Sequence, residues 1–434
     1  MPPFTTLSPD RSGLRSPYWA QRRVGFIMPV VAVATILQLL FLANMSYLYG
    51  VLFKSGSRAH ALKVLAIDYD GAEIGQALSI AYRSLQADTF PTVEYHSASE
   101  YPTPELLHEA ICKEDYWGAV YTHSGASKRL MATIEGQNTT QYDPGSTITY
   151  MYDASYYPII ASSIIQAKME TLISVASRTY YSVATDARAA VNLTDSSSYS
   201  AFVNPIRASS DVRAPINQGT RVLLNTVSMV MPVLMQFFFL MGMNGVFSEA
   251  GVFRKLSKRD TYFIRLIISK SYTFLGGLCM AGYIWAYRED WAVSGGQFGQ
   301  TWMCLWLYME INYLVVDTVI EALIPMKFFS FFMLTWIITN VASTIYPFAL
   351  SAGFYRWAYA LPAHNTLTLL MEVWSGGCKL QNEVALPVLL SWWVLGHIGS
   401  AWSVRKRCIV AEGAQLQKRP DTATSESMIA LENV

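Results

Sequence analysis

Hydrophobic residues are gathered into long runs along the chain rather than spread evenly. The first run covers residues 24–46, and a long mixed segment separates it from a second run at residues 222–247. Further runs lie at residues 263–287, 299–324, 328–350 and 385–404. A helix needs about 20 apolar residues to cross roughly 30 Å of hydrocarbon. The pattern therefore predicts a polytopic α-helical membrane protein with six transmembrane helices.

The first run has features of both a signal peptide and a membrane helix. Arg22 and Arg23 precede it, as basic residues precede a signal core. Its apolar stretch is longer than the roughly 7 to 15 residues of a signal core, and no clear small-residue cleavage site follows. We therefore interpret residues 24–46 as a retained transmembrane helix.

The mixed segment at residues 50–220 is long enough to form a domain. Residues 63–68, 117–121 and 147–152 have the composition of strands, and Asp70-Gly71 predicts a turn after the first. Residues 75–86 and 159–177 have helical character, and a further helix is expected to begin at Pro104 with Thr103 as its N-cap. The segment is therefore predicted to be an α/β domain between the first two membrane helices.

Composition agrees with a membrane protein. Hydrophobic residues make up 52% of the 434 residues and charged residues 15%, below the charged fraction of about 25% in soluble domains. The net charge of +1 indicates no nucleic-acid partner. Membrane lipids are the expected surroundings.

Basic residues near the ends of the runs predict the orientation, because cytoplasmic flanks are rich in Lys and Arg. With the N-terminus inside, the inner flanks hold Arg11, Arg15, Arg22, Arg23, Arg254, Lys255, Lys258, Arg259, Lys327, Arg405, Lys406 and Arg407. The outer short loops hold Arg288, Arg356 and Lys379. The expected order is a cytoplasmic tail (1–23), helix one (24–46), an extracellular domain (50–220), a five-helix domain (222–404) and a second cytoplasmic tail (405–434).

Glycosylation sequons support an external domain. Asn138-Thr-Thr and Asn192-Leu-Thr both lie in the mixed segment. A third match, Asn44-Met-Ser, lies at the edge of the first run and too close to the bilayer. We expect glycosylation at Asn138 or Asn192, and a location in the plasma membrane or the secretory pathway.

Ionisable residues inside the predicted helices are the main functional candidates, because charge at membrane depth is costly and usually faces the protein interior. Glu310, Asp317 and Glu321 share one helical face. Counting about 1.5 Å per residue from the ends of the runs, Arg265 matches Glu321 in depth and Lys270 matches Asp317. Glu310 lies near the bilayer centre with no basic partner at its depth. These five residues are transport candidates, and a role as structural contacts between helices stays open.

Several short motifs resemble catalytic signatures but lack their context. Ser294-Gly-Gly-Gln297 matches part of the signature loop of ABC ATPases, yet the chain contains no GxxxxGK[ST] run to bind phosphates. Asp68-Tyr-Asp70-Gly71 resembles the start of the haloacid-dehalogenase phosphatase motif, and we interpret it as a turn after a strand. We therefore expect neither an ATPase nor any other enzyme, and no cofactor.

Cysteine and histidine spacing predicts no metal site. The five cysteines include no CxxC pair, and the six histidines show no metal-binding spacing. Cys112 and Cys378 are both predicted outside, where disulfides persist. Whether they form a bridge stays open.

The predicted layout, one span followed by an external domain and five more spans, resembles the ABC type-two permeases. More closely, the chain resembles the fungal nitrosoguanidine-resistance family. The residues that carry this resemblance are Val64-Leu-Ala-Ile-Asp-Tyr-Asp-Gly71 and Tyr359-Ala-Leu-Pro362-Ala-His. The resemblance implies drug or toxin resistance at a membrane, by export, and it supplies no catalytic residues.

Three functional hypotheses follow from these patterns. A permease that exports small amphipathic compounds predicts a cavity between the helices that reaches Glu310. A non-transporting scaffold or regulator of lipid distribution predicts a sealed apolar bundle and an exposed patch on the external domain. A membrane-embedded enzyme requires a closed pocket with a second polar group beside the acid. A homodimer is left open.

Overall fold

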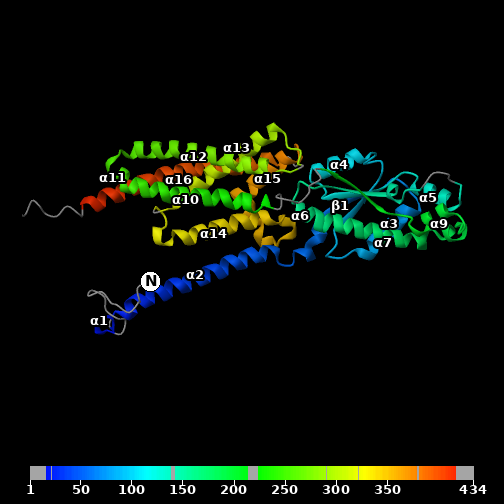
Figure 1. Cartoon of the computed structure of the whole chain (residues 1–434), viewed down its shortest axis with the longest axis horizontal. Helices are drawn as coiled ribbons and strands as arrows, with labels where there is room; N and C mark the ends of the chain where they lie inside the picture. Colours follow the sequence, from blue (N-terminus) through cyan, green and yellow to red (C-terminus); the bar gives the residue numbers. More distant parts are fainter. Residues whose placement is uncertain are drawn as a thin grey trace, which may run out of the picture.

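The computed structural model describes residues 16–20, 22–137, 142–213, 223–289, 291–320, 322–378 and 381–416. The molecule is elongated, with a bundle of long helices at one end and an α/β domain at the other (Figure 1). The long helices of the bundle are α2 (Arg23–Leu52), α10 (Val227–Glu249), α12 (Lys258–Ala286), α13 (Gly295–Val319), α14 (Met326–Ile345) and α16 (Asn382–Leu416). Shorter helices of the same part are α1 (Pro17–Ala20), α11 (Val252–Lys255), α15 (Pro362–Trp374), η5 (Phe348–Leu350) and η6 (Gly353–Ala360).

Six helices in the described part of the chain are long and apolar enough to cross a membrane. Five of them, α2, α10, α12, α14 and α16, overlap predicted runs. The sixth covers residues 158–183 and belongs to the α/β domain, where α7 packs against α3. The remaining predicted run forms α13, which is absent from this set because its polar side chains lower its mean hydropathy. Its neighbours α10, α12 and α16 enclose those side chains.

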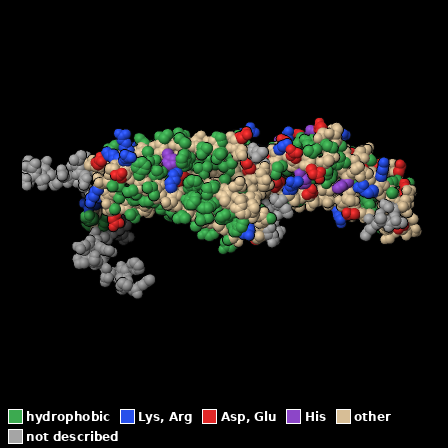
Figure 2. Space-filling view, turned by 90° about the horizontal axis from the view of Figure 1, so that it is seen from above, with side chains coloured by type: hydrophobic (Ala, Val, Ile, Leu, Met, Phe, Trp, Pro, Cys, Tyr) green, Lys and Arg blue, Asp and Glu red, His purple; other side chains and the backbone are tan. Residues whose placement is uncertain are grey.

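The outer surface of the bundle matches a hydrocarbon environment. Figure 2 shows hydrophobic side chains over most of the helical part, with Lys, Arg, Asp and Glu gathered toward its far end and over the α/β domain. Helix α2 diverges from the other helices in Figure 1 and exposes apolar side chains over most of its length. Because water disfavours so much exposed apolar surface, we assign this face to lipid.

The α/β domain is built on one five-stranded sheet with the order β2-β1-β3-β4-β5. Strand β1 pairs in parallel with β2 and β3, β3 pairs antiparallel with β4, and β4 pairs in parallel with β5. The strands are β1 (Lys63–Asp68), β2 (Thr92–His96), β3 (Gly118–Thr122), β4 (Ile148–Asp153) and β5 (Ala208–Arg213). The three predicted strands are confirmed to within one residue. Strands β2 and β5 were not predicted, because both lie at the edges of the sheet and most of their residues are not buried.

Helices cover both faces of this sheet. Alternate side chains of β1 point to opposite faces, as a strand requires: Val64 and Ala66 pack toward α3 and α7, and Leu65 and Ile67 pack toward α4. The helices of the domain are α3 (Glu73–Leu85), α4 (Pro104–Cys112), α5 (Ala126–Ile134), α6 (Pro158–Ile160), a π-helical segment (Ala161–Gln166), α7 (Ala167–Val183), α8 (Thr185–Ala190) and α9 (Ser196–Val203). Short 3-10 turns are η1 (Ser55–Ala61) and η2 (Pro144–Ser146).

The Asp68–Gly71 motif forms a turn, as interpreted from the sequence. The Asp68 carboxylate accepts hydrogen bonds from the backbone N–H groups of Asp70 and Gly71 and from the Thr122 hydroxyl, at 2.6–3.1 Å. The Asp70 carboxylate accepts from the backbone N–H and the hydroxyl of Ser127. Both carboxylates are therefore engaged in joining the ends of β1 and β3 to the helices that follow.

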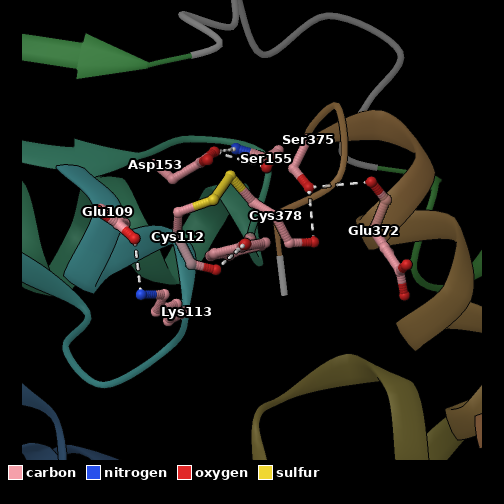
Figure 3. The surroundings of a disulfide bond; sticks show 9 residues. Glu109, Cys112, Lys113, Asp153, Ser155, Glu372, Ser375 and Cys378 are labelled. Carbon is pink, nitrogen blue, oxygen red and sulfur yellow. Dashed lines mark hydrogen bonds and ion pairs between the residues drawn. A yellow bond between two sulfur atoms is a disulfide. The ribbon is translucent and has the colours of Figure 1, made fainter. Parts of the chain in front are cut away.

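A disulfide joins the two parts of the molecule (Figure 3). It links Cys112 at the end of α4 to Cys378, which follows α15, across 266 residues of sequence. The Ser375 hydroxyl donates to the Cys378 carbonyl at 3.1 Å, and the Tyr156 hydroxyl donates to the Cys112 carbonyl at 3.3 Å. The bridge that the sequence left open is therefore present, and it fixes the domain to the α15–α16 connection.

Loss of this disulfide should destabilise the protein. A disulfide that closes a long loop typically contributes about 2–4 kcal/mol by restricting the unfolded chain. We expect Cys112→Ser/Cys378→Ser to lower the midpoint of thermal unfolding, measured in detergent. Cys279→Ser is the control, because Cys279 is a free, exposed thiol. Equal midpoints for the double variant and the control would contradict this role.

Glycosylation tests the orientation of the α/β domain. Asn192 is exposed, and the Thr194 hydroxyl of its sequon donates to the Asn192 side-chain oxygen at 2.7 Å; Asn138 lies outside the described residues. If the domain faces the lumen or the exterior, a glycosidase should increase gel mobility, and Asn192→Gln should remove part of the shift. Asn44→Gln is the control, because Asn44 is buried and contacts Thr335. If the domain carries no glycan and a terminus of the chain is accessible from outside the cell, the orientation is the reverse of the predicted one.

Candidate functional site

Two groups of charged side chains lie between α12, α13 and α16, inside the helical bundle. The first surrounds Asp317 and the second surrounds Glu310, two residues that lie seven positions apart on α13. Both acids are fully buried. Because a buried charge must be paired to be tolerated, these contacts constrain how the helices pack.

The Asp317 carboxylate is held between two arginines. Its Oδ1 atom lies 2.5 Å from Nη2 of Arg265 on α12 and 2.6 Å from Nη2 of Arg407 on α16. Its Oδ2 atom accepts a hydrogen bond from the Ser400 hydroxyl at 2.5 Å. The Asn244 side-chain oxygen on α10 accepts from Arg265 at 2.9 Å and from Arg407 at 3.3 Å. One polar cluster therefore connects α10, α12, α13 and α16.

Aromatic rings complete the surroundings of the two guanidinium groups. The Arg265 guanidinium carbon lies 5.3 Å from the Phe247 ring centroid and 5.5 Å from that of Phe253. The Arg407 guanidinium carbon lies 5.3 Å from the Phe253 ring centroid. Ring faces attract cations, so they partly offset the second positive charge of a cluster with two arginines and one carboxylate. This cluster has the features of a structural contact between helices.

The Glu310 group contains an acid and two bases. The Oε1 atom of Glu310 lies 2.7 Å from Nζ of Lys270 on α12, and its Oε2 atom accepts a hydrogen bond from the Thr273 hydroxyl at 2.7 Å. Lys270 Nζ also lies 3.1 Å from Nε2 of His397 on α16. When Lys270 is protonated, its ammonium donates and His397 Nε2 accepts, so this histidine is neutral. The side chains of Lys270 and His397 stay 30% and 18% exposed.

An apolar pocket between α13, α15 and α16 reaches Glu310. Its volume is about 360 Å³. The walls include Trp306 and Leu307 of α13, Leu369 of α15 and Trp393 of α16, with Glu310 as the charged lining residue. The Trp393 ring also lies 4.7 Å from Lys270 Nζ. The pocket therefore joins an apolar binding surface to a buried carboxylate, the combination expected for an amphipathic ligand.

The predicted charge pairs are wrong in register. Lys270 was expected beside Asp317, whereas Arg265 contacts Asp317 and Lys270 contacts Glu310. The depth estimate began from residues 263 and 324, but α12 begins at Lys258 and α13 ends at Val319. With these helix ends, the residues of α12 lie beside residues of α13 that are more than one helical turn away from those predicted. Glu310 is consequently paired, contrary to the prediction, and Glu321 lies outside the described residues.

Five members of these groups were not identified from the sequence: Arg407, His397, Asn244, Ser400 and Thr273. Arg407 was treated as a residue of the cytoplasmic flank, but α16 continues to Leu416 and places Arg407 inside the bundle. His397 is a titratable residue within the last predicted run, and the depth argument applied to α13 could have identified it. Asn244 carries no charge, so the same argument would have missed it.

Comparisons with known proteins agree with a membrane protein. A family model described as "Protein of unknown function (DUF3533)" matches residues 33–398. The chain is similar to an uncharacterized endoplasmic reticulum membrane protein of Saccharomyces cerevisiae. The two are 18% identical over 392 residues, which cover 83% of this chain and 76% of the relative. No solved structure matches the chain.

The Asp317 cluster can be tested with a double-mutant cycle. Asp317→Asn leaves two buried guanidinium groups without a carboxylate, which typically costs about 3–5 kcal/mol. We expect it to lower the folded yield and the unfolding midpoint in detergent. Arg265→Gln combined with Asp317→Asn should cost less than the sum of the single changes, because the two groups interact directly.

Lys270→Gln combined with Asp317→Asn provides the matched control for this cycle. Lys270 contacts Glu310 rather than Asp317, so these two losses should add. If the losses of stability add for Arg265 and Asp317 but do not add for Lys270 and Asp317, the register predicted from the sequence is correct and the observed pairing is wrong.

Proposed function

The chain belongs to the DUF3533 family, and we propose that it is a proton-coupled permease for small amphipathic compounds that carry a positive charge. The protein is a multi-pass membrane protein. We further propose that it exports these compounds and thereby confers resistance to drugs or toxins. The observation that carries it is the apolar pocket that reaches Glu310 between α13, α15 and α16. No enzymatic activity, cofactor or metal is included in the proposal.

The pocket distinguishes between the three hypotheses drawn from the sequence. A scaffold or a regulator of lipid distribution predicted a sealed bundle, and a pocket of about 360 Å³ between the helices disfavours it. An enzyme required a closed pocket, but Leu386 and Leu390 in the lining are 41% and 44% exposed, so this pocket is open. A permease predicted a cavity that reaches Glu310, which agrees with this pocket.

The charge of the Glu310 group suggests how transport could be coupled to protons. Glu310 and protonated Lys270 cancel each other, and His397 accepts a hydrogen bond as a neutral base. An ammonium substrate at Glu310 would add one positive charge to this low-dielectric site, and so would one proton on His397. Because two added positive charges would repel each other in this low-dielectric site, substrate and proton compete for it. Competition for a single site is the basis of exchange.

The proposed orientation places the α/β domain outside the cytoplasm. The distribution of basic residues supports it, and so does the disulfide between Cys112 and Cys378, because disulfides persist in oxidising compartments. The yeast relative is named as a protein of the endoplasmic reticulum membrane, in line with a location in the secretory pathway.

Glu310→Gln tests the proposed substrate-binding carboxylate, because it preserves the shape of the side chain and removes its charge. We expect the variant to reach the membrane at normal levels. Export of a labelled cationic compound from vesicles under a proton gradient should fall by about tenfold or more, since a hydrogen bond to a charged group contributes about 1.5–3 kcal/mol.

The control is Glu383→Gln, which makes the same change at an exposed position in the first turn of α16. It should transport normally. Unchanged transport by Glu310→Gln with an unchanged pH profile would assign Glu310 to packing alone. Export driven by ATP without a proton gradient would reject proton coupling.

A further inference from the structure

A second pocket lies where the α/β domain meets the helical bundle. Its volume is about 160 Å³, smaller than the roughly 300 Å³ at which pockets for drug-sized ligands begin. It lies apart from the Glu310 pocket and shares no lining residue with it. We name it the junction pocket, and its size fits a small ligand group.

Aromatic rings from both parts of the molecule line the junction pocket. The domain contributes Trp117 and Tyr157, whose ring centroids lie 6.4 Å apart. The bundle contributes Phe348 and Tyr359, whose centroids lie 4.5 Å apart in an edge-to-face arrangement. Tyr359 is 52% exposed, so the pocket can be reached from solvent.

A carboxylate completes the lining. Glu114 follows α4, two residues after the disulfide cysteine Cys112, and its Oε2 atom accepts a hydrogen bond from Gln381 Nε2 at 2.5 Å. Among the described residues that line the pocket, Glu114 is the one with a formal charge at neutral pH when His364 is neutral. The junction pocket therefore combines aromatic rings with a negative charge.

The backbone at this pocket is held in an unusual conformation. Glu114 has φ 63° and Tyr157 has φ 41°, and these are two of the four non-glycine residues with positive φ in the described chain. Side chains with a Cβ avoid this region. Such residues gather at ligand-binding sites, where the surrounding structure holds them in place. Here the disulfide and the Gln381 contact hold the segment that carries Glu114.

We propose that the junction pocket binds a trimethylammonium group. Such a group has no N–H donor, so it needs no hydrogen-bond acceptor and interacts well with aromatic faces. The Glu114 carboxylate supplies the opposite charge. The cation belongs either to the choline headgroup of a lipid or to a soluble quaternary amine.

This binding site does not depend on the proposed transport function. It lies at the junction of the two parts, and its occupancy can be measured at equilibrium on the purified chain. A chain that binds the cation without exporting anything would leave this inference intact and reject only the permease.

The test is calorimetric titration of the full-length protein in dodecyl maltoside, which contains no choline. The probes are choline, its neutral isostere 3,3-dimethyl-1-butanol, and dihexanoyl phosphatidylcholine. We expect choline or the phosphatidylcholine to bind and the neutral isostere to bind at least about fivefold more weakly, the factor that about 1 kcal/mol of cation–ring attraction gives. Tighter binding of the phosphatidylcholine would identify a lipid headgroup as the source, and tighter binding of choline a soluble cation.

Two variants locate the site, each with a matched control. Glu114→Gln should weaken binding about fivefold, whereas Glu109→Gln removes the same charge from an exposed carboxylate that pairs with Lys113 outside the pocket. Tyr359→Leu should weaken binding about threefold, whereas Tyr199→Leu alters a similarly exposed ring on α9.

Three results would overturn the proposal. Equal binding of choline and its neutral isostere would remove the role of charge. Equal losses in the Glu114 and Glu109 variants would indicate surface attraction rather than a site. Absence of binding by both choline and the phosphatidylcholine would reject the pocket as a cation site. Glu114→Gln keeps the inference testable if Tyr359→Leu does not fold.

Discussion

The arrangement of the helical bundle depends on the contact between Asp317 and its two arginines. Three helices each supply one charged group to this contact, and none of the three groups could stay buried in a low-dielectric interior without the others. The contact therefore fixes the register of α13 against α12 and α16. Asn244 extends the same constraint to α10 by accepting hydrogen bonds from both guanidinium groups. Slippage of any of these helices by one turn would separate the charges and leave them unpaired in the membrane.

Helix α13 determines the layout of the bundle because it is too polar to face lipid. Glu310, Asn312 and Asp317 are fully buried, and α13 packs against α10, α12, α15 and α16. Asn312 accepts a hydrogen bond from the Trp336 ring of α14 at 2.9 Å. Small residues allow close approach on the other side, because a Cβ at Gly396 or Gly399 of α16 would meet Leu314 or Thr318 of α13.

The two acids differ in their surroundings: Asp317 lies in a dense cluster of fixed partners, whereas Glu310 borders an apolar pocket and shares Lys270 with His397. The Glu310 carboxylate itself lines its pocket, whereas the pocket beside the Asp317 cluster is lined by Arg407, Phe247 and Phe253 and not by Asp317.

The α/β domain and the bundle are joined at one end by a covalent and several non-covalent contacts. The disulfide ties the end of α4 to the α15–α16 connection, and Gln381 contacts Glu114 beside it. Helix α15 also packs against α13, so it belongs to both the junction and the wall of the Glu310 pocket. The same helix supplies His364 and Thr368 to the junction pocket and Leu369 to the Glu310 pocket.

The sequence by itself determined that this is a membrane protein, and it located the long helices of the bundle and three strands of the sheet. These features depend on the composition of a short stretch of neighbouring residues, which can be read without knowing how the chain packs. It also identified Glu310, Asp317, Lys270 and Arg265 as unusual, since any charge within an apolar run is costly. It could not pair them correctly, because pairing depends on where each helix begins and ends: α13 stops at Val319, five residues before the apolar run does. The edge strand β5, the partners Arg407 and His397, and the Cys112–Cys378 bridge also depended on tertiary structure. Each of these contacts joins segments distant in sequence, and only packing decides which such segments meet.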